Sequence, residues 1–107
     1  MGKQPCVYLL ASGRRGTLYI GVTSDLLKRV WLHRSDIVQG FSKRYHVHNL
    51  VWFEMHATMP AAIARESALK CWKRSWKLDL VEQNNPEWLD LYDDLTCKFN
   101  RSLQHRG

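Results

Sequence analysis

Two short apolar runs near the start of the chain are separated by a glycine-bearing spacer. Residues 6–11 and 17–22 are rich in β-branched and aromatic side chains, which is the composition typical of strands. Residues 12–16, between them, carry two glycines and have the length of a hairpin connection. The pattern therefore predicts an antiparallel β-hairpin.

The turn decides which residues of this hairpin lie opposite one another. If Gly13 and Arg14 form a two-residue turn, Tyr8 pairs directly with Tyr19. Both side chains then point to the same sheet face, because side chains alternate along a strand. Gly21 follows closely and would let backbone or substrate approach, although a simple bulge explains a strand glycine equally well.

A helix is predicted next, from Ser24 to about Arg34. Ser24 is a suitable N-cap, and the carboxylate of Asp25 is favourable at the positive end of the helix dipole. Arg29 and His33 are four residues apart and therefore lie on one face of this helix. Its predicted apolar positions are Leu26, Leu27, Val30 and Trp31.

Residues 35–48 are polar and glycine-bearing, and they predict a long loop that carries Lys43, Arg44 and Tyr45. Long loops inside compact domains are usually functional or mobile. The apolar residues 50–55 that follow predict a third strand.

A second helix is predicted from Pro60, which suits a first helical turn, to about Lys77. Glu66 fills a missing place in its apolar stripe. The expected inward residues of that stripe are Ile63, Leu69, Trp72 and Trp76.

Helical sequence continues to about Gln83 and stops ahead of Pro86, because the residue before a proline is pushed out of helical conformation. Pro86 then opens a short helix to about Leu91. Residues 95–107 are predicted to be a basic, flexible tail, which leaves residues 1–94 as a single domain.

A chain of 107 residues has the length of one domain and can bury a modest core without disulfides or a structural metal. Its sequence has no signal-peptide core and no run near the roughly 18 apolar residues of a membrane helix. We expect a soluble, cytoplasmic protein with reduced thiols. The widely spaced cysteines, which suggest neither a disulfide framework nor a zinc site, are Cys6, Cys71 and Cys97.

The formal net charge of +6 is unevenly distributed along the sequence. Residues 1–50 hold eight Lys and Arg against two Asp, whereas residues 51–107 hold eight charges of each sign. Such an excess suits a polyanion such as nucleic acid, although a basic surface without a partner is an equally common explanation.

Glu66 is the sharpest single signal, because a carboxylate on an apolar stripe costs several kcal/mol if it is buried alone. Metal coordination would compensate that cost and makes Glu66 a candidate metal ligand. The alternative is a carboxylate at the edge of the stripe that is solvated or paired with Lys70 one turn further on.

Phenol, guanidinium and imidazole groups gather within twenty-six residues of the sequence. Arg29 could hold a phosphate with two hydrogen bonds, and His33 could move a proton near neutral pH. Tyr8 and Tyr19 are by default core aromatics, but a phenol beside a cation and an arginine has a lowered pKa and can accept a proton from water.

Tryptophans could offer stacking platforms for bases. Trp72 and Trp76 fall on the apolar stripe of the second helix, so core packing is expected for both. The basic residues on the opposite side of that helix either follow a phosphate backbone or keep the helix soluble, and they are Arg65, Lys70, Lys73, Arg74 and Lys77.

Taken together, these residues resemble the GIY-YIG nuclease family, and in particular its small bacterial single-domain proteins, over about residues 5–94. Val7-Tyr8 stands at the end of the first family motif, and Tyr19-Ile20-Gly21 matches the second motif letter for letter. Cys6 replaces the first glycine of the motif. The other matching positions are Arg29, His33, Glu66 and the turn Asn85-Pro86-Glu87-Trp88.

The resemblance implies an α+β fold in which helices flank a three-stranded antiparallel sheet. It also implies hydrolysis of a DNA phosphodiester with one divalent ion, Mg²⁺ or Mn²⁺, held by Glu66. Tyr8 would receive the proton of the attacking water, and Arg29 would neutralise the pentacovalent phosphorus centre. Tyr19 and His33 would orient water and phosphate, Asn85 or its neighbour Asn84 would position the site, and Gly21, Lys43, Arg44 and Tyr45 would bind substrate.

Three functions fit this resemblance. The first is a metal-dependent endonuclease that prefers single-stranded DNA, because no second recognition domain is expected to grip a long duplex. The second is a nucleic-acid-binding module that has kept the fold without hydrolysis. The third is a cleavage subunit whose protein partner chooses the site.

Overall fold

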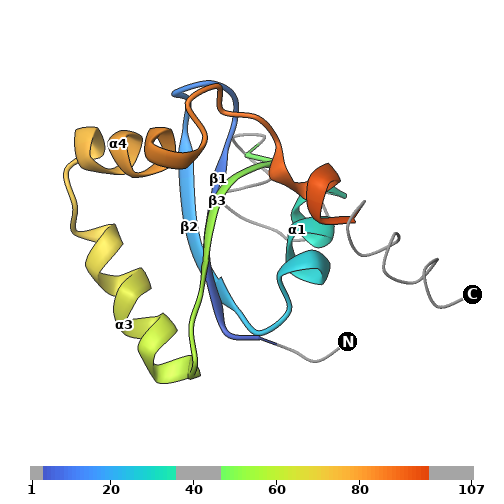
Figure 1. Cartoon of the computed structure of the whole chain (residues 1–107), viewed down its shortest axis with the longest axis vertical. Coiled ribbons are helices and arrows are strands. Elements are labelled where there is room, and N and C mark those ends of the chain that lie inside the picture. The colour runs from blue at the N-terminus through green and yellow to red at the C-terminus, as the bar shows by residue number, and fades with distance from the viewer. Residues whose placement is uncertain (1–3, 36–46, 97–107) are drawn as a thin grey trace, which may run out of the picture.

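The computed structural model describes residues 4–35 and 47–96, and Figure 1 shows them as a sheet flanked by helices. The predicted loop residues Lys43, Arg44 and Tyr45, and the tail from residue 97, lie outside the described residues. The elements are β1 (Cys6–Ala11), β2 (Leu18–Thr23), α1 (Leu26–Arg34), β3 (Asn49–Met55), α3 (Met59–Lys70) and α4 (Arg74–Asn84), followed by a helical segment at residues 91–96.

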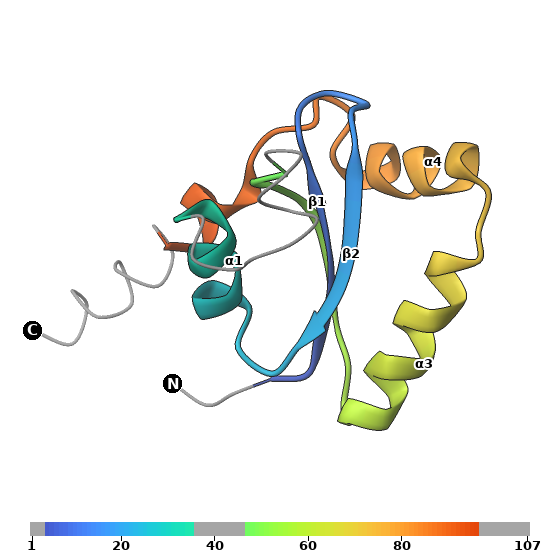
Figure 2. The same cartoon turned by 180° about the vertical axis from the view of Figure 1, so that it is seen from behind.

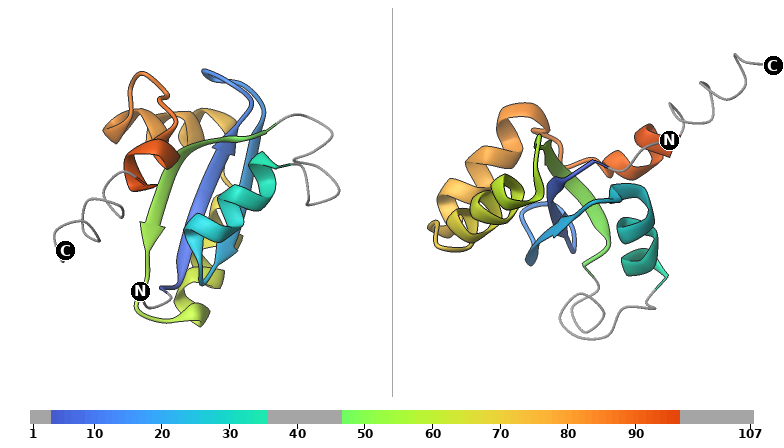
Figure 3. Two further views of the ribbon diagram at one scale, coloured as in Figure 1. Left: turned by 90° about the vertical axis from the view of Figure 1, so that its right-hand side faces the viewer. Right: turned by 90° about the horizontal axis from the view of Figure 1, so that it is seen from below.

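The strands form one antiparallel sheet in the order β2-β1-β3, so β1 is the central strand. α3 and α4 lie on one face of the sheet, and α1 and the last helical segment lie on the other (Figure 1 and Figure 3). The predicted α+β fold is therefore confirmed, with each strand within one residue of its predicted bounds. None of the helices in the described ranges is long and apolar enough to span a membrane.

Alternation along β1 divides its side chains between two cores. Val7, Leu9 and Ala11 pack against α3 and α4. Tyr8 and Leu10 pack against α1 and the last helical segment. Each fully buried leucine of β1 stabilises the fold by about 1.5–3 kcal/mol, so the central strand anchors both helical layers.

The register of the hairpin differs from the prediction by two residues. Tyr8 pairs with Gly21, and Tyr19 pairs with Leu10, so the predicted direct pairing of the two tyrosines is wrong. A shift of two residues preserves the face of every side chain, and the two phenols still share one face.

The connection between the strands is longer than a two-residue turn. Ser12 closes it through its backbone N–H, which donates to the Thr17 carbonyl at 3.0 Å, and through its hydroxyl, which accepts from the Thr17 N–H at 2.9 Å. Arg15 adopts a left-handed backbone conformation with φ 54° inside this loop. The two extra residues account for the shifted register.

α1 begins one residue later than predicted, because Asp25 and not Ser24 is its N-cap, with the Asp25 side chain accepting from the Lys28 N–H. The predicted inward position of Trp31 is also wrong, since half of this side chain is exposed. His33 instead shares the buried face with Val30.

The single helix predicted over residues 60–77 is two helices, α3 and α4, with Cys71 as the C-cap of the first. Arg74 donates to the carbonyls of Arg15 and Gly16 at 2.6 and 2.9 Å, which fixes the start of α4 against the hairpin loop. The break turns part of the predicted stripe outward, since Ile63 and Trp76 are 47% and 50% exposed.

The short helix predicted from Pro86 is also wrong. Residues 86–87 form a turn, and Trp88 has a positive φ of 57°, which ends any helical path. The last helical segment begins after Asp90, whose side chain accepts from the Tyr92 N–H at 3.1 Å. Asp90 is therefore the N-cap that the sequence pattern did not identify.

Gly21 lies directly beneath the ring of Tyr8, and a Cβ atom there would lie 2.4 Å from both Cζ and Oη of that ring. We expect Gly21→Ala to lower the free energy of unfolding by about 1–3 kcal/mol, because the buried ring must move out of its position. Urea denaturation measures the change. Gly13→Ala is the matched control, since a Cβ there meets nothing within 4 Å; equal stability of the two variants would contradict the prediction.

Candidate active site

Three aromatic side chains from three elements meet on the α1-facing side of the sheet. They are Tyr8 of β1, Tyr19 of β2 and His33 of α1. The ring centroids lie 6.3 Å apart for the two tyrosines, 6.0 Å for Tyr8 and His33, and 5.1 Å for Tyr19 and His33. Tyr8 Oη lies 3.2 Å from His33 Nε2, within hydrogen-bond distance.

The backbone explains why these rings can approach so closely. Gly21 leaves room for the Tyr8 ring across the hairpin, and the inward face of α1 presents His33 beside Val30. Tyr8 is 2% exposed and His33 is 1% exposed. A buried imidazole needs a hydrogen-bonding partner, and the phenol provides it.

Burial raises the pKa of Tyr8 well above its ordinary value, and the neighbouring Tyr19 raises it further. The charge of Arg29 lowers this pKa, while the charge of Glu66 raises it. The phenol therefore keeps its proton at neutral pH. The sequence-based expectation of a lowered pKa applied to a phenol beside both a divalent cation and an arginine, and the charge of Arg29 acts on the pKa of Tyr8 in the expected direction.

The pKa of His33 is lowered from 6.5, first by burial and then by the positive charges of Arg29 and His48. The imidazole is therefore neutral at pH 7, and we assign Tyr8 as the donor and His33 Nε2 as the acceptor of their hydrogen bond. His48, just before β3, is a contributor that sequence reasoning missed. The only feature of the sequence that could have identified His48 is its position at the end of the predicted loop, residues 35–48.

Arg29 lies on the exposed side of α1, and its charge acts on both members of the Tyr8–His33 pair. An exposed guanidinium near a buried proton-transfer pair is available to a phosphate. The predicted proximity of arginine, histidine and tyrosine is thus present in the structure.

Glu66 comes from α3, on the far side of the sheet from α1, yet its charge reaches Tyr8. This is geometrically feasible because β2 is an edge strand that lies between α1 and α3 (Figure 2). The Glu66 side chain is 16% exposed and forms an ion pair with Lys70 at 3.2 Å. The ion pair proposed as the alternative to metal binding is therefore present.

The donor set around Glu66 fits a hard divalent cation. No group of three or more His, Cys, Asp or Glu residues gathers anywhere in residues 4–35 and 47–96. Mg²⁺ commonly binds through one or two carboxylates and completes its shell with water and substrate phosphates. The single, partly buried carboxylate of Glu66 could serve such a site, provided that Lys70 releases it.

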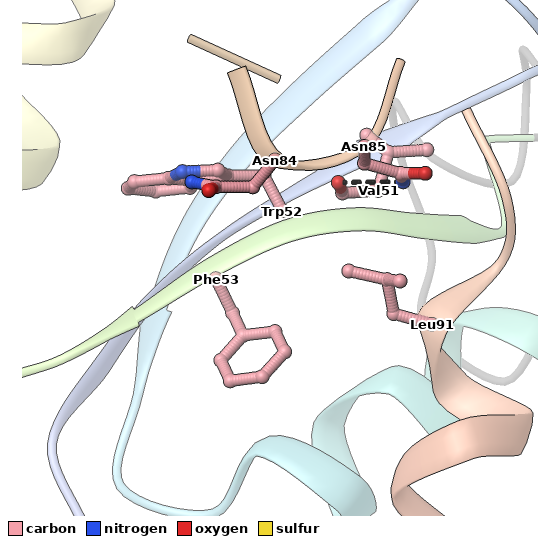
Figure 4. A pocket seen from close by; sticks show the side chains of 6 residues that line it. All are labelled: Val51, Trp52, Phe53, Asn84, Asn85 and Leu91. Atoms are coloured by element: carbon pink, nitrogen blue, oxygen red, sulfur yellow. Dashed lines mark hydrogen bonds between the residues drawn. The ribbon is translucent and has the colours of Figure 1, made fainter. Parts of the chain in front are cut away.

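Asn85 lies apart from this cluster, at β3. Its Nδ2 donates to the carbonyls of Val51 at 3.1 Å and Leu89 at 2.9 Å, and its Oδ1 accepts from the Leu89 N–H at 3.0 Å. Figure 4 shows Asn85 and the exposed Asn84 beside a cavity of about 250 Å³. These bonds give Asn85 a structural role, and its predicted catalytic role rests on the resemblance alone.

The comparisons with known proteins agree on one family. The profile of the GIY-YIG catalytic domain matches residues 4–79, a range that contains the aromatic cluster and Glu66 but not Asn85. A UPF0213 protein of Staphylococcus saprophyticus is 32% identical over 68 residues, which cover 64% of this chain and 83% of that protein. No solved structure gives a significant match.

The structural roles of the neighbouring Asn84 and Asn85 can be distinguished by the effect of each substitution on the free energy of unfolding. Asn85→Ala removes three hydrogen bonds of a side chain that is 5% exposed, and we expect it to lower the free energy of unfolding by about 2–4 kcal/mol. Asn84→Ala at the exposed neighbour is the control, with an expected change below about 0.5 kcal/mol. Chemical denaturation measures both, and equal losses would refute the structural role of Asn85.

The lowered pKa of His33 has a stability consequence. Below pH 6.5, His33 becomes protonated in the unfolded chain but stays neutral in the folded protein. The free energy of unfolding therefore decreases as the pH falls from 6.5 towards the folded pKa, by at most about 1.4 kcal/mol per pH unit. We expect His33→Gln to lose this part of the pH dependence. Denaturation of both proteins between pH 7.5 and 5.5 measures it, and identical slopes would contradict the assignment.

Proposed function

Since the chain belongs to the GIY-YIG catalytic domain family, which indicates a nuclease-type function, we propose that it is an endonuclease that hydrolyses DNA phosphodiester bonds with one divalent ion, Mg²⁺ or Mn²⁺. One observation carries the proposal. The phenol of Tyr8 is hydrogen-bonded to a neutral His33 and lies within the field of both Arg29 and Glu66. A proton acceptor, a phosphate-binding cation and a metal-binding carboxylate thus act at one place.

The raised pKa of Tyr8 argues for proton transfer through the phenol without a stable phenolate. As Tyr8 Oη takes a proton from the attacking water, its own proton passes to Nε2 of His33, 3.2 Å away. The resulting hydroxide forms the new bond to phosphorus while the bond to the leaving oxygen breaks. The imidazolium then gives its proton back to Tyr8 Oη, Tyr8 passes its other proton to a solvent water, and the leaving oxygen takes up a proton from solvent.

The remaining residues supply charge and orientation. Arg29 neutralises the charge that develops on the non-bridging phosphate oxygens, for which a guanidinium is better suited than an ammonium group. Tyr19, in ring contact with His33, orients water and phosphate. Glu66 would hold the divalent ion, which would supply Lewis-acid polarisation of the scissile phosphate and stabilisation of the leaving oxygen.

Single-stranded DNA is the proposed preferred substrate, in a cytoplasmic protein. Residues 4–35 and 47–96 form one unit around a single sheet, and this unit offers no separate module to grip a duplex. Lys43, Arg44, Tyr45 and Gly21 are the proposed further substrate contacts, of which only Gly21 is described.

One observation favours a second function, a nucleic-acid-binding module without hydrolysis. The ion pair between Glu66 and Lys70 would make such a module if Lys70 kept the carboxylate away from a metal ion. Exposed ion pairs of this spacing are worth only about 0.3–0.5 kcal/mol, which a divalent cation readily overcomes. The nuclease is therefore the better-supported function.

Glu66→Gln is the test of the proposed function. We expect cleavage of labelled single-stranded DNA with Mn²⁺ to fall at least about 100-fold, because a neutral amide no longer holds the ion, while DNA binding without metal remains. Gel analysis measures cleavage, and fluorescence anisotropy measures binding.

Asp94→Asn, at an exposed carboxylate of the last helical segment, is the matched control and should cut at the wild-type rate. A wild-type protein that leaves single-stranded, duplex and branched DNA uncut with both Mg²⁺ and Mn²⁺ would refute the nuclease.

A further inference from the structure

The corner between α3 and α4 carries an aromatic and basic surface that the active site does not use. Trp72 and Trp76 stand edge to face, with ring centroids 6.0 Å apart. The guanidinium of Arg65 lies 5.3 Å from the centre of the Trp72 ring, and the ammonium group of Lys73 lies 5.5 Å from that of Trp76. We call this surface, together with Arg74 and Lys77, the α3–α4 corner.

The two indoles have different surroundings. Trp72 is half-buried and packs against the core beneath α3 and α4, so the core accounts for it. Trp76 is 50% exposed, and its only described ring contacts are with Trp72 and Lys73. Packing therefore explains the first indole but leaves the second displayed to solvent on a rigid base.

The cations around Trp76 are not neutralised. Among the described residues, Lys70, Arg65 and Arg15 each have an acidic partner, whereas no ion pair involves Lys73, Arg74 or Lys77. The guanidinium of Arg74 donates to backbone carbonyls of the hairpin loop. Because a carbonyl carries no net charge, these bonds do not neutralise the positive charge of Arg74. Asp79, further along α4, is the acidic residue nearest in sequence. Its single negative charge is smaller than the three positive charges of Lys73, Arg74 and Lys77.

We propose that the α3–α4 corner binds a segment of single-stranded nucleic acid, with a base stacked on Trp76 and phosphates held by Lys73, Arg74 and Lys77. This inference rests on the proposed function, since it concerns the same substrate class. An indole beside uncompensated cations provides both interactions that single strands use, base stacking and phosphate attraction. An acidic peptide would need the cations but would gain little from the displayed indole.

Binding of a single strand at the α3–α4 corner would require little rearrangement of the protein. An exposed contact between a lysine and an indole is weaker than the stacking of a base on that indole, so Lys73 can leave the ring of Trp76 for a phosphate. Trp72 and the hydrogen bonds of Arg74 hold the backbone of the corner in place meanwhile.

The corner is continuous with the active site through α3. This helix carries Glu66 and ends one turn later at Lys70, and Figure 1 and Figure 2 show α3 followed directly by α4. Because an α-helix rises about 1.5 Å per residue, Glu66 and Lys70 are about 6 Å apart along its axis. A strand several nucleotides long can therefore contact both places.

The test measures binding in a Glu66→Gln background without metal, so that cleavage plays no part in it. The probe is a fluorescein-labelled oligothymidylate of 20 nucleotides, followed by fluorescence anisotropy. We expect Trp76→Ala to weaken its binding about five- to hundredfold, since the loss of one stacked base has that size.

Three further variants keep the test independent of folding. Trp76→Phe keeps an aromatic ring and should restore most of the affinity for the 20-mer. Lys73→Gln should reduce the slope of log affinity against log salt concentration by about 0.7. Leu89→Ala removes another exposed apolar side chain, away from the corner, and should change neither quantity.

Three results would overturn the inference. They are a 20-mer that does not bind the parent variant, an unchanged affinity in Trp76→Ala, and an unchanged salt slope in Lys73→Gln. An unchanged affinity would leave an acidic protein as the occupant of the corner. Because these results do not involve cleavage, a failure of the nuclease activity itself is seen separately, in the wild-type protein with Mn²⁺.

Discussion

The buried hydrogen bond between Tyr8 and His33 is the constraint on which the site depends. It joins the central strand to α1 in a place where both side chains are almost fully buried, and an unpartnered buried polar group would cost about 1–3 kcal/mol. The pair is stable only if the phenol keeps its proton and the imidazole stays neutral, which is the direction in which burial moves both pKa values. Gly21 leaves room for the phenol ring. The same packing therefore buries Tyr8 in the core and places its hydroxyl within hydrogen-bond distance of His33.

This pair also explains why a carboxylate on the opposite layer matters. β2 is an edge strand, and the groups that act on Tyr8 come from both sides of it, Arg29 from α1 and Glu66 from α3. Their charges have opposite effects on the phenol, so neutralising Glu66 with a bound cation leaves Arg29 as the charge that lowers the pKa of Tyr8. The site would then favour release of the phenolic proton only when the ion is present, which couples proton transfer to a complete site.

Local regularities of the sequence predicted the strands to within one residue, because alternation of side chains is a property of each strand by itself. The register was not predictable in this way, since the turn depends on the Ser12 hydroxyl and on the left-handed conformation of Arg15. The break between α3 and α4 was hidden for a similar reason: the bonds of Arg74 reach residues more than fifty positions away. The carbonyl of Val51, which Asn85 binds, is 34 positions away in sequence, so a motif could suggest the asparagine but not its role.

The distribution of charge along the sequence differs from the distribution of unpaired charge on the folded protein. The first fifty residues hold the whole formal excess, but several of their cations are paired across the molecule with acids of the second half. These pairs are Arg14 with Glu87, Arg15 with Glu82, and Arg34 with Asp90. The cations that remain uncompensated at the α3–α4 corner belong to the half that appeared neutral. The proposed attraction of a polyanion would therefore involve both halves of the chain, through Arg29 of α1 and through the cations at the start of α4. A substrate that contacted both places would have to be long and flexible enough to pass around the edge of β2.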